Sequence, residues 1–284
     1  IVNDRELSIL EFSEFMDKRV ARRTHFVGEK LFTSAIVAVN EGGQTKVGFV
    51  TGHSEHSPGD QGGQWGYSKF SIMLQQKGFL IKEISLSGTN AIPADCRLLV
   101  IPGPRTPYGP DELNKLHEYI GTGGNIFALF NFFSLQRPTG LETFFEEYGF
   151  EIGANQVSDS KNEQSGNPGL LLIDDLGSHP ITKPILGSRL QMLLPRSIGY
   201  PKVNEGNDDP PPISVLANSS SSSQAIIQTQ DKKGAVEKEG EIPLIAAKIH
   251  SNESQAPARI VVTGDSLFLG DGAFEAGANR DRKS

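Results

Sequence analysis

Short apolar segments alternate with stretches of helical periodicity, and this alternation constrains the fold more than any other feature of the chain. The apolar segments are Lys46–Gly52, Phe79–Leu86, Arg97–Pro104, Asn125–Phe130 and Ala258–Asp265. Helical spacing of apolar residues follows Tyr67, Pro110 and Gly140. Strands that alternate with helices form a mostly parallel sheet with helices on both faces. We therefore predict an α/β fold in which a ligand would lie at the carboxyl ends of the strands.

The chain divides into a short first part and a long second part. Residues 1–44 are predicted to form an N-terminal helical segment that packs on the core, because residues 4–23 place their apolar side chains roughly on one face. Residues 45–284 are predicted to form the α/β domain, and the segment Ala258–Asp265 is expected to rejoin its sheet as a parallel core strand.

A loop-rich insertion is predicted at about 155–240, where the helical and strand patterns weaken. Two segments within it, Leu170–Asp174 and Ser188–Leu194, are predicted as short extra strands that pair antiparallel. A run of serines, Ser219–Ser223, is typical of a linker. We therefore expect mobile loops on either side of the short strands.

Charge and cysteine content exclude several classes of protein. The chain has 27 Lys and Arg against 34 Asp and Glu, a net charge of −7, which argues against nucleic acid and against an anionic membrane surface as partners. Its one cysteine, Cys96, excludes an intramolecular disulfide and a thiolate-rich metal site. No run reaches the ~18 apolar residues that span a bilayer. The chain begins at Ile1 without a Met, and we expect it to be a piece of a longer protein.

Polar residues follow four of the predicted parallel strands at their carboxyl ends. Because these ends meet at one edge of a parallel sheet, we expect the side chains to line a ligand crevice there. The candidate ligand-binding residues are His53, Glu55, Gly103, Arg105, Asn131, Asp265 and Ser266.

Several segments also match a known family in their order along the chain. They are FVGEKLFTSAI beginning near Gly28, KVGFVTGHSEHS (46–57), IPADCRLLVIPGP (92–104), TGGNIFAL (122–129), HPITKPI (179–185), RIVVTGDSLFL (259–269) and ANRD (278–281). This ordered set, over about residues 25–281, resembles the GldG-like auxiliary component of gliding-motility-type ABC transport systems. One departure is RDRKS at the end, where the family has an apolar helix.

The resemblance implies a fold, a location and partners. It implies a flavodoxin-like or class I glutamine amidotransferase-like sheet in a periplasmic or extracytoplasmic domain. Transmembrane anchors would lie outside this fragment. The partners it implies are ABC permease and ATPase subunits or other membrane-complex proteins.

Amidotransferase-like chemistry needs a nucleophile on a sharp strand-to-helix turn. The corresponding turn holds Asn131 and Phe132, neither of which is a nucleophile, and no Gly-x-Ser-x-Gly frames the nearby Ser134. Cys96 lies before a strand, at the wrong end of the sheet. We therefore predict no catalytic residue and a non-enzyme; a serine, threonine or cysteine beside an imidazole in the crevice would contradict this.

Two further hypotheses for the loop after the first strand are a metal site and a phosphate-binding site. His53, Glu55 and His56 offer ligands for zinc, but in an extended segment His53 and Glu55 share a face that His56 does not. A third ligand must therefore come from elsewhere, for example Asp265 or His179. The favoured interpretation is that His53 and Glu55 hydrogen-bond the loop. Asp265 is likewise favoured as a cap of the turn that follows it.

The Gly-rich loop at 57–66 lacks a phosphate-binding motif and is more simply a flexible loop. We therefore predict no cofactor, and the incomplete ligand set described above leads us to predict no metal. Trp65 and Tyr67 could form a contact surface or a clamp over the crevice, and for Tyr67 packing in the core is equally compatible with the sequence.

Together these observations favour a non-catalytic extracytoplasmic binding or scaffolding domain of an ABC-transporter-associated membrane protein, with a glycan or small ligand as a further partner. One alternative is a hydrolase or metal-dependent carbohydrate-active enzyme that uses the crevice. Another is a soluble sugar- or nucleotide-binding module.

Overall fold

A computed structural model describes residues 45–273, except residues 62, 64, 164–166, 168, 201–212 and 252–255. The predicted N-terminal helical segment, residues 1–44, therefore lies outside the described residues. Within the described part of the chain, every helix is too short or too polar to cross a bilayer.

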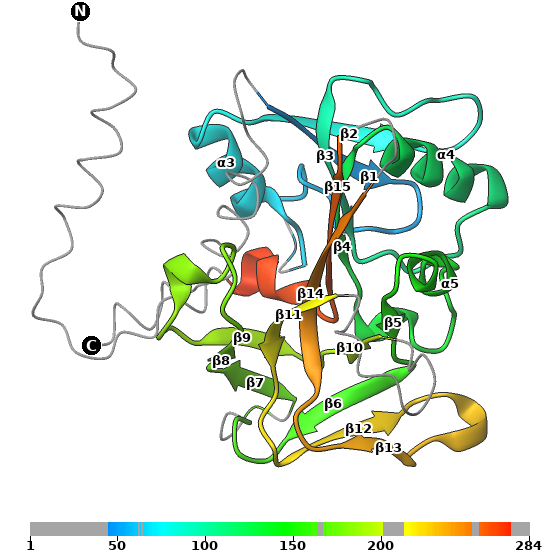
Figure 1. Ribbon diagram of the computed structural model, residues 1–284. Coiled ribbons are helices and arrows are strands. Elements are labelled where there is room, and N and C mark those ends of the chain that lie inside the picture. The colour runs from blue at the N-terminus through cyan, green and yellow to red at the C-terminus, as the bar shows by residue number, and fades with distance from the viewer. Residues whose placement is uncertain are drawn as a thin grey trace, which may run out of the picture.

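The centre of the molecule is an eight-stranded sheet with the order β2-β1-β3-β4-β15-β14-β11-β8 (Figure 1). Strands β2, β1, β3, β4 and β15 run parallel, while β14, β11 and β8 each pair antiparallel with the preceding neighbour in that order. The prediction of a mostly parallel α/β sheet is confirmed. The bounds are β1 (Lys46–Thr51), β2 (Leu80–Ser85), β3 (Cys96–Pro102), β4 (Asn125–Leu129), β8 (Asp175–Leu176), β11 (Ser214–Asn218), β14 (Pro243–His250) and β15 (Ala258–Thr263).

Helices cover both faces of this sheet (Figure 1). They are α3 (Ser68–Gln76), α4 (Pro110–Gly121) and α5 (Leu141–Glu146). Phe70 and Leu74 of α3 pack in one apolar cluster with Phe49 of β1. Leu116 of α4 and Phe145 of α5 belong to the cluster on the opposite face. The residues of β1 alternate between the two clusters, because successive strand side chains point to opposite faces.

The predicted insertion contains more regular structure than its polar composition indicates. Three small sheets occur among its described residues and those around it, with the orders β10-β5, β13-β12-β6 and β7-β9. The predicted antiparallel pair of short strands is confirmed as β7 and β9. The bounds are β5 (Glu151–Ile152), β6 (Asn155–Asp159), β7 (Leu170–Ile173), β9 (Leu190–Leu193), β10 (Ile198–Gly199), β12 (Ser223–Ile227) and β13 (Val236–Glu239).

The serine run differs from the linker that was expected. Asp159 accepts hydrogen bonds from the backbone N–H and the hydroxyl of Ser220, both at 2.7 Å. The hydroxyl of Ser219 accepts one from the backbone N–H of Ile242 at 3.0 Å. Serine hydroxyls can bind nearby backbone and carboxylate groups, so this run forms an ordered turn between β11 and β12, in which Ser219, Ser220 and Ser223 are buried and Ser221 and Ser222 are exposed.

The return of β15 beside β4 determines where polar residues meet. Its parallel pairing with β4 confirms that the chain rejoins the main sheet after the insertion. The carboxyl ends of β1, β3, β4 and β15 therefore lie along one edge of the sheet. Strand β1 lies between β2 and β3, so the chain changes direction across the sheet at β1, the position where ligands bind in open α/β sheets.

Candidate functional site

A buried polar cluster lies at the carboxyl ends of β1, β3, β4 and β15. The Ser266 hydroxyl is 2.8 Å from His56 Nε2 and accepts a hydrogen bond from Asn131 Nδ2 at 3.2 Å. Asn131 Nδ2 also donates to the Gly103 carbonyl at 3.1 Å. His56 is 4% exposed, Asn131 1% and Ser266 0%. Three of the predicted residues are thus brought together, but they fill the interior and do not line an open crevice.

Gly103 belongs to this cluster because its lack of a side chain leaves room for the polar atoms around it. Its φ is +66°, and a Cβ at this position would lie 2.6 Å from both Asn131 Nδ2 and the Ser266 hydroxyl. The same Cβ would lie 2.9 Å from His56 Nε2. Only glycine combines this backbone conformation with so close an approach.

The cluster consists of neutral groups. Burial, followed by the charge of Arg105, lowers the pKa of His56 to about 4, so its imidazole is neutral at pH 7. The His56 ring stacks on Tyr67 at 5.0 Å, and the Tyr67 hydroxyl donates to the Ser266 carbonyl. Burial raises the pKa of Tyr67 well above its ordinary value.

His53 and Glu55 form a second group, which holds the loop after β1. His53 Nε2 is 3.0 Å from Glu112 Oε2, and its ring stacks on Tyr108 at 3.9 Å. Glu55 accepts hydrogen bonds from the backbone N–H of His53 and from the Tyr108 hydroxyl, both at 2.6 Å. These contacts attach the loop to the start of α4, which is the loop-fixing role that sequence analysis favoured over a metal.

The side chains of Asp265 and Arg105 make their contacts outside both groups. The carboxylate of Asp265 accepts hydrogen bonds from the backbone N–H groups of Leu193 and Leu267, both at 2.7 Å, as expected for a cap. Burial nevertheless raises the pKa of Asp265 to about 7. The guanidinium carbon of Arg105 lies 4.2 Å from the centroid of the Phe133 ring, near the surface.

The described residues contain no group of three or more His, Cys, Asp or Glu side chains placed to hold a metal ion. Asp265 is engaged by backbone donors, and His179 Nδ1 accepts a hydrogen bond from Ile181 N at 3.2 Å. Neither therefore joins His53 and Glu55.

The turn after β4 carries Asn131 and Phe132 where a nucleophile was sought. Ser134 donates to the Asn131 carbonyl at 3.1 Å and accepts a hydrogen bond from Arg196 Nη1 at 3.1 Å, so its hydroxyl is engaged structurally. The Ser266–His56 pair, however, is a serine beside an imidazole, the arrangement of a nucleophile and its base, and sequence analysis named this arrangement as the one that would contradict a non-enzyme. Full burial of Ser266 separates it from any substrate in this conformation.

Sequence reasoning missed the aromatic and acidic partners of the loops. Tyr108, Glu112 and Phe133 contact predicted residues, yet none follows a strand directly. Glu112 had a usable signal, because a carboxylate three residues into a helix faces the loops at its start. The two aromatic residues whose role the sequence left undecided differ in burial: Tyr67 is fully buried, whereas Trp65 is 36% exposed.

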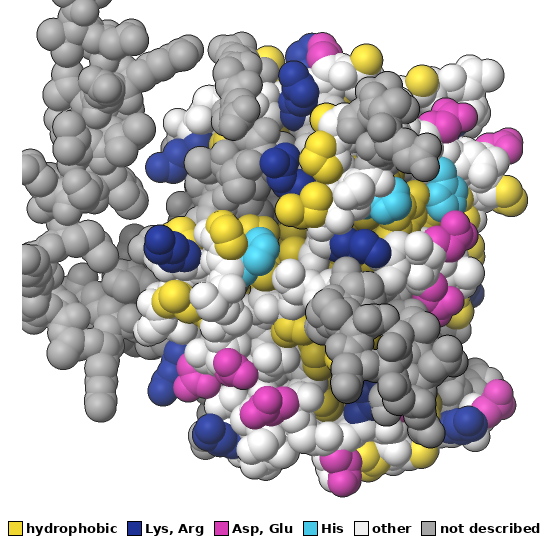
Figure 2. Space-filling model, viewed as in Figure 1, with side chains coloured by type: hydrophobic (Ala, Val, Ile, Leu, Met, Phe, Trp, Pro, Cys, Tyr) yellow, Lys and Arg dark blue, Asp and Glu magenta, His cyan; other side chains and the backbone are white. Residues whose placement is uncertain are grey.

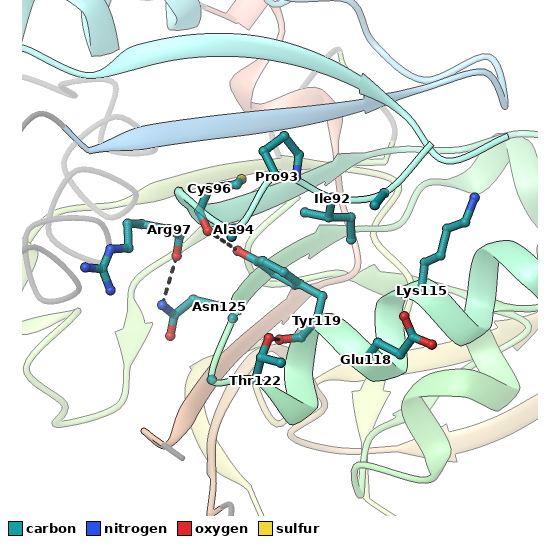
Figure 3. A pocket seen from close by; sticks show the side chains of 13 residues that line it. Ile92, Pro93, Ala94, Cys96, Arg97, Lys115, Glu118, Tyr119, Thr122 and Asn125 are labelled. Carbon is teal, nitrogen blue, oxygen red and sulfur yellow. Dashed lines mark hydrogen bonds between the residues drawn. The ribbon is translucent and has the colours of Figure 1, made fainter. Parts of the chain in front are cut away.

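A cavity of about 290 Å³ lies at the opposite edge of the sheet, between the starts of β3 and β4 and the end of α4 (Figure 3). The Tyr119 hydroxyl in its wall donates to the Cys96 carbonyl at 3.2 Å, and Asn125 Nδ2 donates to the Arg97 carbonyl at 2.9 Å. Cys96 also lines a neighbouring cavity, and burial raises the pKa of its thiol. These wall groups already have partners, and none of the predicted ligand residues lines either cavity.

The fold is similar to solved structures at low sequence identity. The mmIFT52 N-terminal domain is 14% identical, with a TM-score of 0.57 over 82% of this chain and 92% of that domain. ThuA-like proteins from Bacteroides uniformis and Parabacteroides merdae are 14% and 15% identical, with TM-scores of 0.43 and 0.42. Both matches cover 84% of this chain; they cover 93% of the Bacteroides uniformis chain and 91% of the Parabacteroides merdae chain. No curated protein matches the chain significantly.

A family profile gives the more specific result. The profile described as "ABC-type uncharacterized transport system" matches residues 44–283, which include the whole described part of the chain. The chain therefore belongs to the ABC-type uncharacterized transport system family, the auxiliary components of ABC transport.

Proposed function

We propose that the chain is a non-catalytic binding or scaffolding domain on the extracytoplasmic side of the membrane. It belongs to a membrane protein that associates with an ABC permease and ATPase or with other membrane-complex proteins. Family membership supports a transporter-associated role. The observation that carries the non-catalytic part is the enclosure of the Ser266–His56 pair in the interior. Ser266 is fully buried and already bound by His56 and Asn131.

The sheet supports a flavodoxin-like or class I glutamine amidotransferase-like scaffold for this role. The parallel strands have the order β2-β1-β3-β4-β15, which corresponds to the flavodoxin order 2-1-3-4-5. In the proposed domain, the crevice of such a scaffold is filled by side chains that fix the loops. The loops then act through their outer surface.

The surface composition is consistent with a protein partner. Figure 2 shows acidic, basic and hydrophobic side chains interspersed on the face that it presents. Protein interfaces have this mixed character, whereas a polyanion such as nucleic acid requires a field of positive charge. The net charge of −7 points the same way.

Copurification tests the scaffolding role. The full-length protein is expressed with the permease and ATPase of its own transport system, and the membrane fraction is purified through a tag on the ATPase. Stoichiometric retention of the full-length protein is the expected result. Loss of the full-length protein during purification would contradict the scaffolding role. A reporter fused to this domain that is active on the cytoplasmic side of the membrane would contradict the extracytoplasmic location.

A hydrolase is the second candidate, and the 2.8 Å approach of Ser266 to His56 favours it. A neutral imidazole next to a hydroxyl is suited to general-base catalysis. The test is hydrolysis of amide, ester and phosphate substrates by the wild type and by Ser266→Ala. Turnover that disappears in Ser266→Ala would replace the proposed function with this one.

A further inference from the structure

An exposed group of two aromatic rings and one guanidinium lies beside the buried polar cluster; we call Trp65, Phe133 and Arg105 the aromatic–arginine surface. Trp65 is 36% exposed and Phe133 37% exposed. Their ring centroids are 6.0 Å apart, nearly perpendicular at 82°. The Arg105 guanidinium lies over the Phe133 ring at 4.2 Å. Trp and Arg are the residue types most enriched among interface residues that carry binding energy.

Contacts with the buried cluster and with the His53 loop hold the three segments that carry this surface. The Asn131 side chain accepts a hydrogen bond from the backbone N–H of Phe133 at 3.0 Å. The His56 ring stacks on Tyr67, two residues after Trp65, with 5.0 Å between the ring centroids. The backbone N–H of Arg105 donates to the His53 carbonyl at 2.9 Å. The surface is therefore already ordered before a partner binds, which reduces the entropic cost of binding.

The charge of Arg105 is unmatched within the described part of the chain. Arg105 makes no ion pair there, and its Nε is a buried donor without a hydrogen-bond partner. Burial lowers the pKa of Arg105, which reflects the cost of a partly desolvated cation. The side chain is partly exposed, so a carboxylate from another molecule would supply the missing counter-charge through the paired terminal Nη donors.

We propose that the aromatic–arginine surface docks a protein segment of a transporter subunit, in which a carboxylate lies beside an apolar side chain. The carboxylate pairs with Arg105, and the apolar side chain packs on Trp65 and Phe133. The proposal rests on the proposed function, because it names the contact through which the scaffold holds its partner.

The test measures the affinity of the full-length protein for the purified permease–ATPase complex of its own system. Phe133→Ala, Trp65→Ala and Arg105→Ala are each expected to raise Kd roughly 10-fold or more. Arg105→Lys is expected to recover only part of the loss, since a lysine cannot offer the paired donors of a guanidinium. Higher salt should weaken binding of the wild type more than binding of Arg105→Ala.

Matched controls separate this surface from others. Arg97 is an exposed arginine at the opposite edge of the sheet, and Leu186 is a hydrophobic residue that is 51% exposed. Arg97→Ala and Leu186→Ala should bind as the wild type does. Thermal unfolding of every variant checks that each one folds.

Three outcomes would overturn the proposal. If the wild type binds and the three alanine variants bind equally well, the surface is not the docking site, and the proposed function survives. If the wild type fails to bind the complex, both are wrong. If instead alginate, a polymer of sugar carboxylates, binds the wild type and Arg105→Ala abolishes that binding, the ligand of the surface is a glycan.

Discussion

The imidazole of His56 and the hydroxyl of Ser266 lie 2.8 Å apart, although 210 residues separate them in the chain. His56 follows the first strand of the parallel sheet and Ser266 follows its last, so the contact closes the carboxyl edge of the sheet. Both side chains are buried, and Asn131 from the loop after β4 completes the group. The contact therefore links the loops after β1 and β4, which carry Trp65 and Phe133, to the loop after β15.

Loss of the Ser266 hydroxyl should destabilise the fold. In Ser266→Ala the buried His56 Nε2 and Asn131 Nδ2 each lose a partner, and an unsatisfied buried polar group costs about 1–3 kcal/mol. Urea denaturation should report a decrease of that size in the free energy of unfolding. The control is Ser87→Ala, because the Ser85–Ser87 hydrogen bond is exposed and its loss should cost less than about 0.5 kcal/mol. Equal stability of the two variants would contradict the structural role of the hydroxyl.

Gly103 offers a test of crowding in the same cluster. Gly103 and Gly88 have nearly the same φ, +66° and +64°, but nothing lies within 4 Å of a Cβ built at Gly88. Both alanine variants incur the cost of left-handed backbone, which is roughly 1 kcal/mol. Gly103→Ala should cost at least a further ~1–3 kcal/mol, because its Cβ meets three polar atoms of the cluster.

The measurement is thermal or urea unfolding of the two variants beside the wild type. A difference near zero between Gly103→Ala and Gly88→Ala would mean that the cluster repacks freely around a methyl group.

The strands of the main sheet could be predicted because their apolar runs are continuous. KVGFVT and CRLLVIP are buried on both faces of the sheet, and such strands need no information from distant residues. The serine run could not be interpreted correctly, because its order depends on Asp159, about 60 residues earlier in the chain. A linker and an ordered serine turn have the same local composition.

The candidate site was predicted in part for a related reason. Strand ends identify which residues meet, and Gly103, Asn131 and Ser266 do meet. They do not indicate side-chain direction, so Asp265 was included although its carboxylate binds the backbone of β9. The exposed Phe133 was not among the candidate residues, because it follows its strand by several residues and its contact with Arg105 joins two separate loops.

The stability of the protein should depend on pH through Asp265. Burial raises the pKa of its carboxyl from 3.8 to about 7, so the folded state binds a proton between these values that the unfolded state releases. The resulting stabilisation is complete below the unfolded pKa and is lost as pH rises through about 7, by about 1.4 kcal/mol for each unit of the shift.

Asp265→Asn removes this titration. Its free energy of unfolding, measured in urea from about pH 5 to about pH 8, should therefore fall less with rising pH than that of the wild type. Parallel curves for the two proteins would show that the carboxyl of Asp265 titrates normally, as it would if the backbone donors from Leu193 and Leu267 outweighed burial.

Arg196 and Glu142 form a buried ion pair whose disruption should be costly. The Arg196 side chain is 2% exposed, and its Nη1 lies 3.0 Å from Glu142 Oε1. Arg196→Met should lower the free energy of unfolding by about 3–5 kcal/mol, because it leaves the carboxylate without its partner. The double variant Arg196→Met/Glu142→Gln should lose less than the sum of the two single variants. Lys238→Ala is the control, since the Lys238–Glu151 pair is 36% exposed on each side and such pairs contribute at most about 1 kcal/mol. Strict additivity of the two buried substitutions in urea denaturation would mean that Arg196 acts through its hydrogen bond to the Gly153 carbonyl rather than through its charge.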